Sequence, residues 1–319
     1  MPNTKLLFAY DGSRCADSAL HEVEAAGLPG DADVVVLTVA DVWLPPETED
    51  DERVIDSLDP QIQARVLALR QSATSKVSEA AATAKRGAQI LKSIFPTWQV
   101  SDEAFADSPG WGILKKADSW PADLVILGAH GISVIERLMI GSVSRKVLNH
   151  ASCSVRIARS EAVKKHTSPR LIIAFDGSVD AELAVREVAR RVWPERTQVR
   201  LITVVDDTLR TAIAARIFKS DPWVSTGQTE DHHVWLSNMS ENAAENLRRA
   251  QLQTTCLITE GDPKRVLLEE AEQWQASCVF VGATGLRGLR RLLLGGVSSG
   301  VASAAACSVE VVRRRTASI

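Results

Sequence analysis

The sequence has little of what marks secreted, metal-binding or membrane proteins. Its five cysteines are scattered and form no C-x-x-C pair, so neither a disulfide framework nor a cysteine metal site is expected. No apolar run approaches the ~18–20 residues that a membrane helix needs, and the first residues do not resemble a signal peptide. We therefore expect a cytoplasmic protein with reduced thiols and no membrane partner.

An excess of one charge is also missing. The chain has 37 Lys+Arg against 40 Asp+Glu, a net charge of −3, so its charge predicts no nucleic-acid partner. Of the six histidines, His232 and His233 are adjacent and cannot both lie on one helix face. We expect no metal site made by the protein alone. With 45% apolar residues and a length of 319, the chain suits two globular domains.

The sequence does contain an internal repeat. Lys5–Ser13 (KLLFAYDGS) matches Arg170–Ser178 (RLIIAFDGS), 165 residues further on. Near the end of each half, Cys153–Arg159 (CSVRIAR) matches Cys307–Arg313 (CSVEVVR) at a spacing of 154. One duplicated unit explains both spacings if the first half carries a loop longer by 11 residues.

Each half alternates short apolar runs with stretches of helical periodicity. This alternation predicts an α/β protein with two tandem, open, five-stranded and mainly parallel sheets, Rossmann-like, with helices on both faces. The strands are expected at 6–10, 34–40, 99–105, 124–127 and 155–158, and at 171–175, 199–205, 254–259, 279–281 and 309–312. We predict domains at residues 1–160 and 169–319, joined by a linker at 161–168.

Glycines and hydroxyl residues gather where parallel sheets bind ligands, after the carboxyl ends of strands. Asp11-Gly12-Ser13 follows the first strand, Gly128-x2-Gly131 follows the fourth, and Gly141-Ser142 opens a helix after nine further residues. Glycines let a backbone approach a phosphate, and a helix start offers free N–H groups and a positive dipole end. The pattern predicts a phosphate site, and it recurs in the second half.

The complete pattern, D-G-S followed by G-x2-G-x9-G-S, resembles the universal stress protein family in its ATP-binding branch, over essentially the whole chain and in two copies. The C-S-V-x-h-x-R strand is also similar to that family's C-P-V-h-h-V-R. The resemblance implies an adenine-nucleotide α-hydrolase-like fold and ATP, or ADP or AMP, as ligand, with Mg²⁺ carried by ATP. It also implies a stress-response role, an unidentified protein partner, and an intramolecular pseudodimer joined through the fifth strands; a homodimer of the chain is left open.

In that family the Asp after strand one and a Val near the end of strand two hold the adenosine, while the glycines and Ser/Thr hold the phosphates. The resemblance therefore implies two sets of nucleotide-binding residues. These are Asp11, Val39, Gly128, Gly131, Gly141, Ser142, Val143 and Ser144 in the first half, and Asp176, Val204, Gly282, Gly285, Gly295, Gly296, Val297 and Ser298 in the second. Gly296 departs from the family's Ser/Thr, and Asp107-Ser108-Pro109 departs from its Gly-x-Pro.

No catalytic residue is evident, because neither motif fixes an acid or base beside the γ-phosphate and no Walker lysine is present. We expect an ATP-binding regulator that hydrolyses ATP slowly or not at all. The alternatives are a nucleotide-free scaffold that binds a partner or small ligand, and an enzyme acting at the α-phosphate, which would carry an S-G-G-x-D-S loop. Asp11 and Asp176 could instead cap helices, His130 is expected to be solvated, and Arg287 and Arg290 are candidate phosphate ligands.

Overall fold

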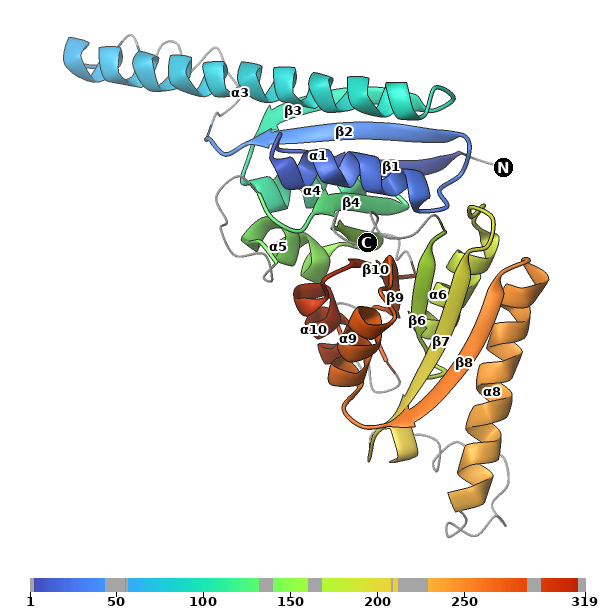
Figure 1. Cartoon of the computed structure of the whole chain (residues 1–319). Coiled ribbons are helices and arrows are strands. Elements are labelled where there is room, and N and C mark those ends of the chain that lie inside the picture. Colours follow the sequence, from blue (N-terminus) through green and yellow to red (C-terminus); the bar gives the residue numbers. More distant parts are fainter. Residues whose placement is uncertain are drawn as a thin grey trace.

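All ten strands of the computed structural model belong to one sheet, with the order β3-β2-β1-β4-β5-β10-β9-β6-β7-β8 (Figure 1). The structure describes residues 3–43, 55, 57–131, 140–159, 168–207, 209–211, 229–285 and 294–314. The strands are β1 (Thr4–Ala9), β2 (Ala32–Ala40), β3 (Gln99–Ala106), β4 (Leu124–Gly128), β5 (Ser154–Ala158), β6 (Arg170–Ala174), β7 (Gln198–Val205), β8 (Gln253–Glu260), β9 (Cys278–Gly282) and β10 (Ser308–Val312). Each half contributes five parallel strands, which confirms the predicted fold class.

Helices cover both faces of this sheet (Figure 1). They are α1 (Arg14–Glu22), the 3₁₀ helix η1 (Val23–Ala25), α3 (Pro60–Ile94), α4 (Pro109–Ser119), α5 (Ser142–His150), α6 (Val179–Arg190), α8 (Thr229–Arg249), α9 (Pro263–Gln273) and α10 (Gly296–Ala304). Helices α4, α5, α9 and α10 share one apolar core that runs across both halves. On the opposite face, α1 and α3 cover the first half, and α6 and α8 cover the second. In the described part of the chain, no helix is long and apolar enough to cross a membrane.

The two halves join through the antiparallel pair of β5 and β10, called the seam below. Its register places Val155 opposite Val311, Arg156 opposite Glu310, and Ile157 opposite Val309. Because the repeat spacing here is 154 residues, Arg156 and Glu310 also occupy equivalent repeat positions. The pseudo-twofold axis therefore passes between them, and the predicted association through the fifth strands is confirmed.

The arginine that ends each C-S-V-x-h-x-R segment fastens this seam. Arg159 follows β5 and donates through Nη2 to the carbonyl of Ala302 in the last turn of α10, at 2.8 Å. Arg313 follows β10 and donates through Nη1 to the carbonyl of Ala151, which caps α5, at 2.5 Å. Each arginine therefore reaches the carboxyl end of a helix in the other half, where the helix dipole favours a cation.

Candidate functional site

Asp11 and Gly131 meet at the carboxyl edge of the first half, because β1 and β4 are neighbours. Asp11 Oδ1 accepts the Ser13 N–H at 3.0 Å, in a turn where Gly12 has φ 74°. A Cβ built on Gly131 would lie 2.8 Å from Asp11 Oδ2. Only glycine therefore lets the β4 loop lie against this carboxylate.

The cap of α1 is a serine, not the aspartate. Ser13 is the N-cap residue, and its Oγ accepts the Ala16 N–H at 3.1 Å. Ser178 caps α6 in the same way. The alternative in which Asp11 and Asp176 serve as helix caps is therefore wrong.

The second half repeats this geometry. Asp176 Oδ1 accepts the Ser178 N–H at 2.9 Å, and Gly177 again has φ 74°. A Cβ on Gly285 would lie 2.9 Å from Asp176 Oδ2. The duplicated motif thus folds into two matching carboxylate–glycine contacts.

Gly128 and Gly282, which end β4 and β9, allow a helix to pack closely on the strand. A Cβ on Gly128 would lie 3.1 Å from the carbonyl carbon of Cys15 in α1. The same atom on Gly282 would lie 2.7 Å from the carbonyl carbon of Asp180 in α6. These glycines have a packing role, and their contact with a phosphate stays a prediction.

Gly141 and Gly295 bring the start of a helix to the glycine loop. Each is the N-cap residue of its helix, α5 or α10, with no side-chain cap. The Gly141 N–H donates to the Ala129 carbonyl at 2.8 Å, and Gly295 does the same to Ala283. The first turns of α5 and α10 therefore lie beside the loops that follow β4 and β9. Their uncapped N–H groups and positive dipole ends suit an anion.

The serines of these helix turns differ in role. Ser144 is buried, and its Oγ donates to the Gly128 carbonyl at 2.8 Å. Ser298 Oγ donates to the Gly282 carbonyl at 2.5 Å. Both hydroxyls hold a helix to the end of a strand. A ligand would therefore meet the N–H groups of these serines rather than their hydroxyls. Ser142 is exposed at the first position of α5, so its hydroxyl faces solvent.

The other predicted residues of these turns differ in exposure. Val143 is half-buried and packs against the shared core, whereas Val297 is exposed. Gly296 is exposed, and a Cβ built on it would meet no atom within 4 Å. Space for a side chain therefore exists at Gly296, where the first half has Ser142.

Val39 presents its main chain beside Asp11. The carbonyl of Leu37 accepts the Tyr10 N–H at 2.9 Å, and Val39 lies two residues further along β2. Because main-chain groups alternate sides along a strand, the Val39 N–H and carbonyl face the β1 side, beyond the last paired residue, Ala9. The Val39 side chain packs on α4, where a Cβ on Gly112 would lie 2.9 Å from Val39 Cγ1.

Val204 occupies the matching place in β7. It lies two residues after Ile202, whose carbonyl accepts the Phe175 N–H at 2.8 Å. Its side chain is buried in the shared core. In both halves, a ligand at the carboxyl edge would therefore meet the valine's main chain rather than its side chain.

An arginine that sequence reasoning missed lies against the first site. Arg86 of α3 donates through Nη2 to the Gly12 carbonyl at 3.3 Å and through Nε to the Tyr10 hydroxyl at 3.2 Å. Burial, then the hydrogen bond from the Tyr10 hydroxyl to Asp17, raises the pKa of Tyr10. In the second half the side chain of Met239 lies against the corresponding glycine. The two sites therefore differ in charge near the D-G-S turn.

The glycine loops differ as well. In the second half, Asp180 Oδ2 accepts the Thr284 N–H at 3.0 Å and its hydroxyl at 2.5 Å, which ties the loop to α6. The repeat has Cys15 and His130 in these two places. Both ring nitrogens of His130 are buried and have no hydrogen-bond partner among the described residues. The prediction of a solvated histidine is wrong.

Other candidates fall outside this geometry. Arg287 and Arg290 lie outside the described residues. Among the described residues, no three His, Cys, Asp or Glu side chains gather as metal ligands.

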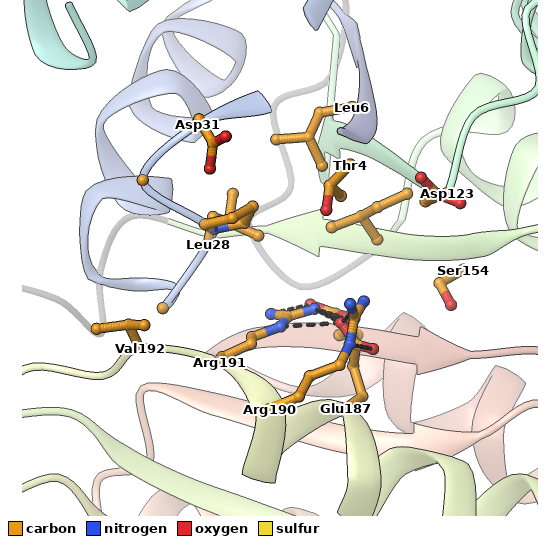
Figure 2. Close-up of a pocket in the computed structure, with 15 residues that line it drawn as sticks. Thr4, Leu6, Leu28, Asp31, Asp123, Ser154, Glu187, Arg190, Arg191 and Val192 are labelled. Carbon is orange, nitrogen blue, oxygen red and sulfur yellow. Dashed lines mark hydrogen bonds and ion pairs between the residues drawn. The ribbon is translucent and has the colours of Figure 1, made fainter. Parts of the chain in front are cut away.

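A cavity of about 290 Å³ lies between the two halves, at the amino ends of the first half's strands, and contains none of the predicted nucleotide-binding residues. Thr4, Leu28 and Asp123 of the first half form one wall, and Arg190 and Arg191 of the second half face them (Figure 2).

Comparison with known proteins identifies the repeated unit. The sequence model of the universal stress protein family matches residues 2–159 and again residues 168–313. A universal stress protein of Mycolicibacterium smegmatis is 29% identical over 197 residues, which are 61% of this chain and 63% of that protein, less than two thirds of its length. Universal stress protein YxiE of Bacillus subtilis is 23% identical over 146 residues, 45% of this chain and 98% of that protein.

A solved structure extends the likeness to the whole chain. The crystal structure of a universal stress protein from Archaeoglobus fulgidus has a TM-score of 0.61 at 19% identity. The match covers 98% of this chain and 100% of that one. The two proteins share a fold.

Proposed function

The chain belongs to the universal stress protein family, and on that premise we propose that each half binds one adenine nucleotide at the carboxyl edge of its strands. The ligand is ATP, or ADP or AMP, with Mg²⁺ carried by the triphosphate. The observation that carries the proposal is the duplicated contact of Asp11 with Gly131 and of Asp176 with Gly285, each beside an uncapped helix start.

The nucleoside lies between the ends of β1 and β2. Asp11 uses Oδ1 for the Ser13 N–H, and its Oδ2 accepts a hydroxyl or amino group of the ligand. The Val39 main chain, beyond the paired part of β1, offers one donor and one acceptor to the edge of the base. This arrangement selects a nucleoside by hydrogen bonds, since a site left with unpaired polar groups discriminates strongly against the wrong ligand.

The phosphates lie against the first turn of α5. Gly131 brings its backbone to the ligand without a side chain, and the N–H groups after Gly141 are uncapped. The exposed Ser142 hydroxyl donates to a terminal phosphate or ligates its Mg²⁺. In the second half, α10 takes this role without the hydroxyl, because Gly296 occupies the serine position.

The protein acts as a nucleotide-binding regulator of a stress response rather than as an efficient enzyme. Its sites offer phosphate donors, but the motifs fix no general base beside the γ-phosphate. A turnover above about 1 s⁻¹, the lower end for kinases, would contradict this assignment.

We further propose functional units at 1–160 and 169–319 joined by 161–168, a cytoplasmic location, and a protein partner that reads the nucleotide state.

Thermal unfolding with MgATP tests the proposal, together with mass spectrometry of the denatured, freshly purified protein for bound nucleotide. At a concentration 100 times the dissociation constant, a ligand stabilises the folded state by about 2.7 kcal/mol, so a rise in Tm is expected. Asp11→Ala should abolish binding at the first site. Asp118→Ala is the matched control, because this carboxylate accepts the Ser152 hydroxyl away from the motif. Absence of both bound nucleotide and a Tm shift favours the nucleotide-free scaffold.

A further inference from the structure

Unlike charges face each other at the centre of the seam. Arg156 Nη1 lies 3.0 Å from Glu310 Oε2, and the side chains are 2% and 0% exposed. These residues stand directly opposite each other in the β5–β10 register. They also occupy the same position of the repeated unit, so the two copies of one ancestral position carry opposite charges on the pseudo-twofold axis.

Each of these central residues also has a partner within its own half. Arg156 donates to Glu22 of α1 through Nε at 3.0 Å and Nη2 at 2.5 Å. Glu310 accepts from Arg191, which follows α6, at 3.0 Å. At the seam, the first half therefore contributes an arginine that is paired with its own glutamate. The second half contributes a glutamate that is paired with its own arginine.

The arginine that supports Glu310 also reaches the first half, at a position where that half has a small residue. Arg191 Nη1 donates to the carbonyl of Ala26 at 3.2 Å across the two halves, and Ala26 is the residue equivalent to Arg191 in the repeat. The Arg191 side chain is 4% exposed and also binds Glu187. Figure 2 shows Arg191 and Glu187 joined at the wall of the inter-half cavity, with Leu28 of the first half across from them.

We propose that this charge arrangement makes the two halves selective for each other and prevents each half from pairing with a second copy of itself. A pair of first halves with the same strand register would place Arg156 against Arg156, and a pair of second halves would place Glu310 against Glu310. Such like charges would meet in a site shielded from water, where their repulsion is weakly screened. Arg156 and Glu310 would also each lose the oppositely charged partner that they have across the seam.

The same contacts define the partner that each half accepts. The first half fits a fifth strand with a central carboxylate, and the second half fits a fifth strand with a central guanidinium and a small residue at the place of Ala26. In a pair of second halves, Arg191 would meet another Arg191 where it now meets Ala26. Two chains can therefore associate through the seam only by exchanging unlike halves.

Refolding of the cut protein tests this selectivity. A protease site placed within residues 161–168 allows the folded chain to be cleaved between its halves. The cut protein is then unfolded in urea, refolded by dilution and weighed by native mass spectrometry, which distinguishes the pairs because the halves differ in mass. We expect about a hundredfold or greater excess of unlike over like pairs, the order that a broken buried ion pair implies. Like pairs in comparable amounts would overturn the proposal.

Charge reversal in the uncut chain provides a second measurement that does not depend on refolding of the halves. Arg156→Glu places three carboxylates together, and Glu310→Arg places three guanidiniums together, so each should lower the Tm. The double variant R156E/E310R is neutral again and should be more stable than either single variant. A double variant no better than the worse single one would contradict the proposal. For the refolding experiment, Arg200→Glu is the control, because its partly buried pair with Glu270 lies within the second half, and it should leave pairing in the cut protein unchanged.

Discussion

Asp11 lies so close to Gly131 that a single methyl group on the glycine would come within 2.8 Å of the carboxylate. Gly131→Ala should therefore displace Asp11 Oδ2 and weaken nucleotide binding at the first site. Loss of one hydrogen bond to a charged group corresponds to about 1.5–3 kcal/mol, or about ten- to a hundredfold in affinity. Titration calorimetry of this variant in an Asp176→Ala background would isolate the first site.

Gly30→Ala is the matched control for that substitution. A Cβ on Gly30 would meet no atom within 4 Å, and this glycine lies in the loop before β2, at the amino end of that strand. It should bind nucleotide like the parent protein. Unchanged affinity in Gly131→Ala would show that the carboxylate does not contact the ligand.

The core elements of this fold could be predicted because their signals are local and occur twice. Strands of a sheet covered on both faces are apolar throughout, as at residues 34–37, and each predicted strand agrees with the structure to within two residues at either end. The D-G-S turn and the glycine loop were placed at one edge by the rule that parallel strands end together. Duplication then fixed the position of the second copy.

The remaining features depend on contacts between residues far apart in the sequence. Glu22 would be read as a solvated helix residue, yet it is buried because Arg156, 134 positions away, lies against it. The serine hydroxyl of Ser144 is taken by the end of β4, which the motif alone does not reveal. Arg86 reaches the D-G-S turn from the last third of a 35-residue helix whose rotation the sequence leaves open.

The glycines that end β4 and β9 should control stability rather than binding alone. Gly282→Ala would bring a Cβ to 2.7 Å from the Asp180 backbone, and Gly128→Ala to 3.1 Å from that of Cys15. Overpacking of this kind costs about 1–3 kcal/mol, so we expect a lower Tm for both and the larger decrease for Gly282→Ala. Gly296→Ala, with open space around its Cβ, is the control and should not be destabilised. Equal Tm values for all three variants would contradict the packing role.

The charge cluster beside the seam should make the protein sensitive to acid. Burial alone would raise the pKa of Glu187, but the guanidiniums of Arg191 and Arg190 outweigh it and hold the pKa below its usual value of 4.5. A carboxylate with a lowered folded-state pKa stabilises the protein above its unfolded pKa, and this contribution is lost as pH falls through the folded pKa. The stabilisation from Glu187 should therefore be complete at neutral pH and be lost progressively as the pH falls below 4.5.

Comparison with Glu187→Gln measures this contribution. At pH 7 the variant should be less stable by about 1.5–3 kcal/mol, the value of a hydrogen bond to a charged group, because Arg191 keeps Glu310. The difference should shrink in acid, as followed by urea unfolding at a series of pH values. Glu182→Gln is the control, since its pair with Arg186 is largely exposed and spans 3.9 Å. A difference between Glu187→Gln and the parent that stays constant in acid would contradict the prediction.

The two nucleotide sites should differ in their affinity for the triphosphate, and one atom group accounts for most of the difference. Ser142 can donate its hydroxyl to a terminal phosphate or ligate Mg²⁺, whereas Gly296 offers only its N–H. Because a Cβ fits at Gly296 without contact, Gly296→Ser should raise the affinity of the second site for MgATP by about ten- to a hundredfold, the value of a hydrogen bond to a charged group. The reciprocal Ser142→Gly should lower the affinity of the first site for MgATP by a similar factor. Calorimetry in Asp11→Ala and Asp176→Ala backgrounds separates the sites. If the second site binds MgATP more tightly in the parent protein and Gly296→Ser leaves its affinity unchanged, the hydroxyl does not determine the difference in affinity. In that case the positive charge of Arg86 beside the first D-G-S turn does not favour triphosphate binding either.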